Sequence, residues 1–335
     1  MSKPYTAKIV MSGPTGAGKT SLLAAMYPLL ETHFPSEDYQ LVPEENTRKV
    51  LDNLRAKLQS LGTGGIKIKD KQIAGTLQAQ EFNFDLRYNG VQNAPPSTDM
   101  SLQVWDIPGA YCTADNGAKA REYLDDSDIS FWCVDSVSLM ERHGEFNEST
   151  NAPNEMADCF LASKMKPGHT MCIVLMRSET YQQYGGEDKL LKTFKDKYAA
   201  TVMRLRKRPC IGKIFICAIQ TTGNLRFNVY EGSDPVFIRA QSFDGYAPKF
   251  CELPVLVAVS HSLDFAIRDA AKNINRITKE CFPFTRWLPF LPGHVEYKHK
   301  KEVAKRLPAR LKEVRDDIKK VLEDETSQKQ HFQEW

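Results

Sequence analysis

One segment of the chain combines residue types and spacing suited to holding phosphate. Residues 13–20 read GPTGAGKT and fit the pattern G-x-x-x-x-G-K-[ST]. Its glycines allow consecutive backbone N–H groups to turn toward one anion, in a geometry that a Cβ would obstruct. Lys19 would contact the β- and γ-phosphates as a point charge, and Thr20 would offer its hydroxyl to Mg²⁺. The segment therefore predicts a site for a nucleoside triphosphate and its metal.

The flanking residues supply the elements that such a loop needs. Residues 7–12 (AKIVMS) predict a short apolar strand, and residues 21–30 (SLLAAMYPLL) predict a helix. The positive N-terminal end of that helix would face the same anion. The alternative is a glycine-rich turn with an incidental Lys-Thr pair. We expect nucleotide contacts from the loop and the residue after it: Gly13, Pro14, Thr15, Gly16, Ala17, Gly18, Lys19, Thr20 and Ser21.

A second motif lies downstream of this loop. Residues 101–109 (SLQVWDIPG) predict a buried strand ending in D-x-x-G. In that arrangement Asp106 would lie near Mg²⁺ and the amide of Gly109 would face a γ-phosphate. Residues 82–88 alternate apolar and polar side chains, and we expect them to pair with residues 102–106 as a hairpin with a long connection. A simple Asp-Pro-Gly turn is the alternative.

With these motifs, roughly residues 7–225 resemble the Ras- and Arf-like GTPases of the translation-factor-related class of P-loop proteins. Apolar runs at 129–135, 171–176 and 213–219 continue the order of strands. The resemblance implies a three-layer α/β domain with a mostly parallel sheet, a helical insertion before the second strand and a helical C-terminal extension. We expect the GTPase-like domain over residues 1–280, its insertion at about 31–75, and a basic extension over 281–335.

The resemblance also implies further site residues. Thr76 stands where the family's switch I supplies a threonine to Mg²⁺, with Thr63 less favoured, and a solvated loop hydroxyl is the alternative. Residues 176–179 (MRSE) replace N-K-x-D, so Arg177 would stack on a base and Glu179 would accept from guanine, unless both only cap a strand. Residues 220–223 (QTTG) loosely match the loop that contacts guanine O6. Catalytic roles fall to Lys19 and Thr76, the cofactors are GTP or GDP with Mg²⁺, and ATP is left open.

The residue after D-x-x-G bears on turnover. Ala110 replaces the glutamine that orients water in Ras-like members. We therefore expect a slow GTPase acting as a molecular switch, stimulated by a protein partner, with Arg121 or Arg142 as less favoured internal groups. The departures resemble those of specialised bacterial members. An ATPase or phosphotransferase using the same loop, and a nucleotide-binding module without turnover, are the two alternatives.

Composition agrees with one large core plus an appendage. The 335 residues are 41% hydrophobic and 26% charged. The sequence has no apolar run near 18 residues and no basic-then-apolar leader, so we expect a cytoplasmic protein. The eight cysteines form no C-x-x-C, which favours a reducing compartment without structural zinc. Residues 223–254 read as an irregular, turn-rich excursion.

Three helices outside the motifs have one apolar face each. Residues 43–61 predict a helix within the extended switch I, ended by Gly62, with a hinge at 62–65. In residues 189–208 lysines and arginines lie opposite an apolar stripe. Basic residues also fill 298–320, where Pro308 predicts a helix start before the stripe Leu311, Val314, Ile318 and Val321. We favour docking of this stripe on the parent domain over partner binding. Net charge is only +3, so nucleic acid or membrane contact through the basic helices is not favoured.

Overall fold

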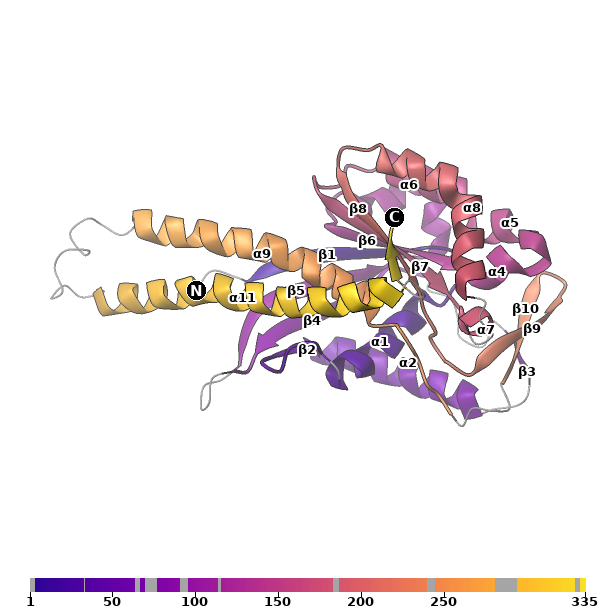
Figure 1. The fold of residues 1–335 in the computed structure, drawn as a ribbon, viewed down its shortest axis with the longest axis horizontal. Coiled ribbons are helices and arrows are strands. Elements are labelled where there is room, and N and C mark those ends of the chain that lie inside the picture. The colour runs from indigo at the N-terminus through magenta and orange to yellow at the C-terminus, as the bar shows by residue number, and fades with distance from the viewer. Residues whose placement is uncertain are drawn as a thin grey trace.

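The protein is built on one large mixed sheet (Figure 1). The structure is a computed structural model, and it describes residues 4–32, 34–63, 67–69, 77–90, 96–113, 116–182, 187–239, 245–280, 294–328 and 332–335. The eight strands of the sheet follow in space the order β11 (Phe332–Glu334), β8 (Ile211–Ala218), β7 (His169–Met176), β6 (Ile129–Asp135), β1 (Tyr5–Ser12), β5 (Ser97–Asp106), β4 (Gln80–Tyr88) and β2 (Tyr39–Pro43).

Most of this sheet is parallel, as predicted. β1 lies at its centre, parallel to both β5 and β6, and the parallel run continues through β7 to β8. The predicted hairpin is confirmed, because β4 pairs antiparallel with β5 in the register Phe82↔Val104 and Phe84↔Leu102. The outer strands β2 and β11 are both antiparallel to their neighbours. Neither edge strand was predicted.

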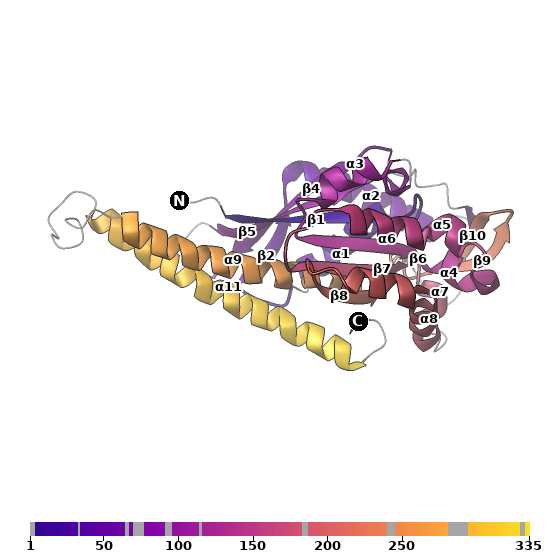
Figure 2. The ribbon, with the colours of Figure 1, turned by 90° about the horizontal axis from the view of Figure 1, so that it is seen from above.

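Helices cover both faces of the sheet (Figures 1 and 2). In β6, Phe131 and Cys133 pack into one hydrophobic core while Trp132 and Val134 pack into the other, as the alternation of a strand requires. The first core is covered by α1 (Lys19–Thr32), α2 (Glu45–Thr63), α9 (Leu253–Glu280) and α11 (His294–Gln328). The second is covered by α3 (Gly117–Leu124), α6 (Pro153–Ala162) and α8 (Glu187–Arg206).

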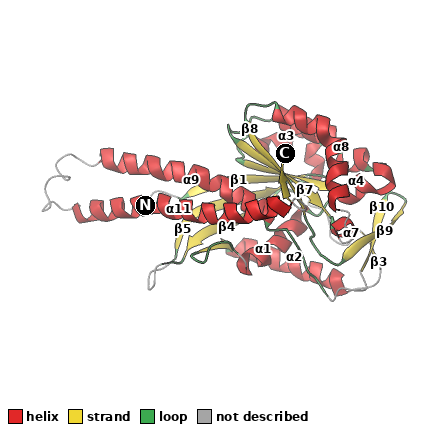
Figure 3. Cartoon of the chain, viewed as in Figure 1, coloured by secondary structure: helices red, strands yellow, loops and turns green. Residues whose placement is uncertain are grey.

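Short helical segments fill the connections (Figure 3). They are η2 (Gly109–Cys112), α4 (Ser136–Met140), η3 (Glu141–Gly144), α5 (Asn147–Asn151) and α7 (Glu179–Gln182). None of the helices in the described part of the chain is both long and apolar enough to cross a lipid bilayer.

A second, small sheet corrects the prediction for residues 223–254. β9 (Leu225–Glu231) and β10 (Asp234–Arg239) form an antiparallel hairpin, and β3 (Lys67–Lys69) pairs with the outer side of β10. Gly232 has φ +67° in the turn between β9 and β10, a conformation that suits glycine. Segment 225–239 was missed although Leu225, Phe227 and Val229 alternate with polar residues, because the burial of these strands depends on neighbours elsewhere in the chain. The small sheet thus ties the insertion to the segment after β8.

The prediction of a helix start at Pro308 is wrong. α11 begins at His294 and carries Pro308 in its interior. A proline there removes one backbone hydrogen bond. Packing after the proline compensates for this loss, because Leu311, Val314 and Ile318 are fully buried in the core shared with the sheet. The apolar stripe therefore docks on the body, with Leu322 buried and Val321 only half-buried.

Two other boundaries differ slightly from expectation. α2 begins at Glu45 and continues to Thr63, so Gly62 does not end it. The predicted hinge at 62–65 lies partly outside the described residues. The predicted division of the chain at residue 280 coincides with the end of α9, and the partition into domains stays a prediction.

Candidate phosphate-binding site

The glycine-rich loop lies between β1 and α1, at the carboxyl end of the central strand. Gly13 has φ +142°, and a Cβ built there would come within 2.4 Å of the carbonyl oxygen of Cys133 on β6. Gly16 and Gly18 also have positive φ values, +81° and +91°. The loop can therefore take this path only with glycine at position 13, where close packing against β6 and backbone conformation agree.

The lysine of the loop is folded back over it. Lys19 Nζ donates hydrogen bonds to the carbonyl oxygens of Gly13 and Pro14, both at 3.1 Å. The residue is 5% exposed although it carries a charge. A buried ammonium group at the first residue of α1, bonded to two carbonyl oxygens of the glycine loop, is the chemistry expected of a site for an anion.

The two predicted metal ligands meet at the start of α1. The hydroxyl of Thr20 donates to Oδ2 of Asp106 at 2.5 Å. Asp106 is fully buried at the end of β5, and parallel pairing places it beside Met11 of β1. The structure thus brings a hydroxyl and a carboxylate, separated by most of the first hundred residues, to one point next to the loop.

The glycine of D-x-x-G lies directly against the loop backbone. A Cβ on Gly109 would come within 2.4 Å of the Thr15 nitrogen and within 2.8 Å of the Gly13 carbonyl oxygen. The residues after it form the single turn η2, in which Ala110 is exposed. Glycine is therefore required at position 109 for β5 and the loop to approach this closely.

Arg177 reaches the same loop from the end of β7. It adopts a left-handed conformation with φ +57°, and its guanidinium donates to the carbonyl oxygen of Gly16. The same group lies 3.5 Å from Asp135 Oδ1 and 5.2 Å from the ring centroid of Phe237 on β10. The predicted stacking of Arg177 on a base stays a prediction.

Glu179 binds the loop that follows β8. Its Oε1 accepts hydrogen bonds from the backbone nitrogen and the hydroxyl of Thr222, at 3.0 and 3.1 Å, and from the nitrogen of Gly223 at 3.5 Å. The side chain is buried, and burial raises the pKa of this carboxyl while the three donors oppose the shift. The structure thus joins segments 176–179 and 220–223, which the resemblance separately assigned to base recognition.

Some expected residues lie elsewhere. Thr76 is outside the described residues, and its suggested substitute Thr63 ends α2. Arg142 pairs with Glu145 at 3.7 Å and lies over the rings of Phe146 and Tyr230. Ser21 is buried in the first turn of α1, and Arg121 lies on α3. The candidate internal arginines thus have no described contact with the loop.

Two residues of the site were not predicted from the sequence. Asp135 ends β6, and its Oδ1 lies 3.5 Å from the guanidinium of Arg177. Its Oδ2 accepts hydrogen bonds from the nitrogen and hydroxyl of Ser138 at 3.0 and 2.7 Å. The available signal was an aspartate that ends a mostly apolar strand. Phe237 lies in the segment taken as irregular, so no signal pointed to it.

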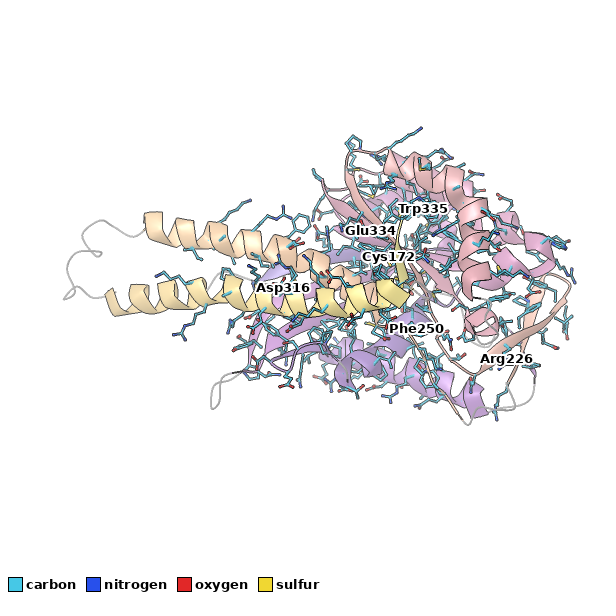
Figure 4. The ribbon with its side chains drawn as sticks, viewed as in Figure 1. Cys172, Arg226, Phe250, Asp316, Glu334 and Trp335 are labelled. Carbon is cyan, nitrogen blue, oxygen red and sulfur yellow. The ribbon has the colours of Figure 1, made fainter. Side chains whose placement is uncertain are left out.

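The cysteines contribute packing. Cys172 and Cys217 face each other across β7 and β8 with their sulfurs 3.3 Å apart, and Figure 4 labels Cys172 within the sheet. Burial raises the pKa of the Cys133 thiol, so it stays neutral. Within the described ranges, no cluster of three or more His, Cys, Asp or Glu has the arrangement of a metal site.

Comparisons with known proteins add little. No family model and no curated protein matches the chain. Among solved structures, the chain is similar to the conserved domain of the dynein light intermediate chain, with 8% identity and a TM-score of 0.30, over 79% of this chain and 91% of that chain. A likeness this weak supports no inference about function.

Proposed function

We propose that the protein binds a nucleoside triphosphate with Mg²⁺ and acts as a slow, partner-stimulated GTPase switch. The observation that supports this proposal most directly is that Lys19, Thr20 and Asp106 meet at the glycine loop, with Gly109 packed against the loop backbone. These groups come from two segments far apart in the sequence, residues 13–20 and 106–109, and each suits a different part of a Mg-triphosphate. This is the arrangement that a P-loop NTPase fold requires.

The donor set fits Mg²⁺. Thr20 and Asp106 offer a hydroxyl and a carboxylate oxygen already 2.5 Å apart, and hard oxygen ligands of this kind are those that Mg²⁺ prefers. When bound, Mg²⁺ would neutralise charge on the β- and γ-phosphate oxygens. Thr76 is the proposed third ligand from the protein. Lys19 would exchange its two carbonyl partners for phosphate oxygens.

Base preference rests on Glu179 and its partners. The Glu179 carboxylate is buried, and Thr222 and Gly223 bond its Oε1. Its Oε2 would be the acceptor for the base, two residues after Arg177, which bonds Gly16. Guanine offers two N–H donors on one edge, whereas adenine offers an acceptor at the equivalent ring nitrogen. This complementarity favours GTP over ATP, and an ATPase or phosphotransferase remains the alternative.

Turnover is expected to be slow. Ala110 follows Gly109 and carries no group able to orient water. A regulatory partner would supply that group, as a trans arginine does where it raises rates by about 10³ to 10⁵. The same residue favours the second candidate function, a module that binds nucleotide without hydrolysing it.

Isothermal titration of the purified chain with GTP, GDP, ATP and ADP in Mg²⁺ tests the proposal. We expect guanine nucleotides to bind at least tenfold more tightly than adenine nucleotides, and Lys19→Ala to weaken binding by roughly tenfold or more. Lys192→Ala, an exposed lysine of α8, is the matched control. Unchanged affinity in folded Lys19→Ala would show that the loop is not the site.

A further inference from the structure

The last two long helices form an arm that extends beyond the sheet. α9 and α11 run side by side, and both views show their far ends projecting away from the body (Figures 1 and 2). The near end of the arm is part of the core, where Leu256, Leu263 and Leu311 are buried. On the far part, the described residues Lys272, Lys305 and Arg306 are exposed. The far part of the arm is therefore presented to surroundings other than this chain.

Two arginines of α11 hold the arm in place. Arg310 on α11 lies 3.1 Å from the carboxylate of Asp99 and 4.1 Å from the ring centroid of Tyr88. One turn further along, Arg315 bonds Asp264 of α9 at 2.8 Å. The Asp99 carboxylate is buried and also accepts from the Tyr39 hydroxyl at 2.7 Å. The arm is thus fastened to β4 and β5 as well as to itself, and Asp99 in turn bonds Tyr39 of β2.

Charge is strongly segregated toward the far end. Residues 271–306 contain nine Lys or Arg and three Asp or Glu, a net charge of +6. The whole chain carries +3, so all the other residues together carry −3. An anionic surface would therefore attract the far end of the arm and repel the body.

The sequence joining the helices favours lipid over nucleic acid as that surface. Residues 281–293 (CFPFTRWLPFLPG) hold six large apolar side chains and one charge. Tryptophan and other apolar residues beside lysine and arginine are typical of segments at membrane interfaces, while phosphate backbones require only the charge. These joining residues lie outside the described part of the chain, and the proposed contact surface is confined to the two helices.

We propose that the far part of the arm, residues 271–280 and 294–306, docks on an anionic membrane surface, a contact that the net charge of the whole chain alone did not favour. A polybasic surface gains affinity from phosphatidylserine-type headgroups, at about fivefold per lysine close to the bilayer, and this gain falls with salt. The rest of the chain has a net negative charge, so the same surface would repel it. The proposal does not depend on nucleotide binding.

The test is co-sedimentation of the full chain with two kinds of vesicle. One is phosphatidylcholine alone, and in the other about a third of the lipid is phosphatidylserine. We expect pelleting with phosphatidylserine only, lost at high salt. In the variant, Lys298→Gln, Lys300→Gln, Lys301→Gln and Lys305→Gln should lower the partition coefficient by roughly tenfold or more.

A matched control removes the same charge elsewhere. It carries Lys57→Gln, Lys192→Gln, Lys207→Gln and Lys312→Gln, four exposed lysines outside the far part of the arm. It should pellet as the unmodified chain does, and circular dichroism should be the same for all three proteins. Equal losses in both variants, no binding to phosphatidylserine vesicles, or tighter binding to a DNA duplex at the same salt would overturn the proposal.

Discussion

Gly109 and Thr15 are so close that no side chain fits between them. A Cβ on Gly109 would approach the Thr15 nitrogen to 2.4 Å, well inside any normal contact, and the obstructing atom is backbone. The loop and the segment after β5 therefore share one tightly fitted surface. A displacement of either segment therefore moves the other. Such coupling is required if a phosphate group bound at the loop is to change the position of the segment after β5.

We expect Gly109→Ala to weaken triphosphate binding by at least tenfold and to destabilise the fold by about 1–3 kcal/mol, because the added methyl forces backbone apart. Titration calorimetry and urea unfolding measure the two effects. Gly117→Ala is the control, since its Cβ would meet only side-chain atoms, the Cys159 sulfur at 3.4 Å and Arg121 Nη1 at 3.7 Å. Equal affinities of the two variants would contradict the close approach.

The isolated chain should turn over GTP well below once per minute, on the order of the 10⁻⁴ s⁻¹ known for unassisted GTPases, because Ala110 cannot orient water. Single-turnover phosphate release measures this rate. Since position 110 is exposed, Ala110→Gln should fold normally and hydrolyse faster. Rapid multiple turnover by the unmodified chain would instead indicate an internal catalytic group.

Guanine nucleotide affinity should fall on acidification at pH values above the ordinary carboxyl range. Burial raises the pKa of Glu179, and a protonated Glu179 loses the acceptor that guanine needs. Glu179→Gln should bind GDP weakly and without this pH dependence, while keeping an oxygen for Thr222. Titrations across pH with GDP, and with ADP for comparison, decide the matter. A wild-type pH profile in Glu179→Gln would assign the titration to another group.

Stability should decline as pH falls below about 6.5. Burial lowers the pKa of His169 to about 3, and its ring bonds Ser130 Oγ at 2.9 Å. In the unfolded chain this imidazole takes up a proton near pH 6.5, whereas in the folded chain it stays neutral. The free energy of unfolding therefore falls by up to about 1.4 kcal/mol for each pH unit until the pH approaches 3. Urea unfolding at pH 7 and pH 5 measures the slope.

His169→Gln should remove much of that slope, leaving the part due to His261, whose pKa burial lowers to about 4. The exposed His143→Gln is the control and should keep the wild-type slope. An unchanged slope in His169→Gln would mean that other groups govern acid unfolding.

Phe332→Ala should cost about 3–5 kcal/mol of unfolding free energy. Phe332 is 1% exposed and stacks on Phe215 with ring centroids 5.3 Å apart. Glu334, labelled in Figure 4, makes only a half-exposed ion pair with Lys213, so Glu334→Ala should change stability by well under 1 kcal/mol. Thermal unfolding compares the two variants, and similar values would mean that β11 adds little.

The parts of this fold that the sequence predicted are those in which local pattern and burial agree. β6 and β7 are buried along their whole length, so their apolar runs were unambiguous. α8 repeated its apolar residues at helical spacing, and Leu190, Phe194 and Tyr198 are fully buried. The glycine loop was found because its residue types are dictated by geometry.

The missed parts depend on distant partners. β2 and β11 are short edge strands, and each forms only because tertiary structure brings it beside another strand, β4 and β8 respectively. Pro308 is a local helix breaker that tertiary packing overrides. The contact of Arg177 with Gly16 joins residues far apart in sequence, and no local pattern could reveal it.

The small sheet has a consequence for how the chain folds during synthesis. β3 belongs to the segment between α2 and β4, yet its only partner strand in the described structure is β10, which follows β8. The glycine loop and the strands next to β1 have been synthesised long before β10 leaves the ribosome. Residues 67–69 are therefore synthesised well before their partner strand, and so is most of the main sheet. Synthesis of the glycine loop and final placement of the insertion are thus separated in time, and a chain stalled in translation before residue 234 would contain the loop but lack the partner strand of β3.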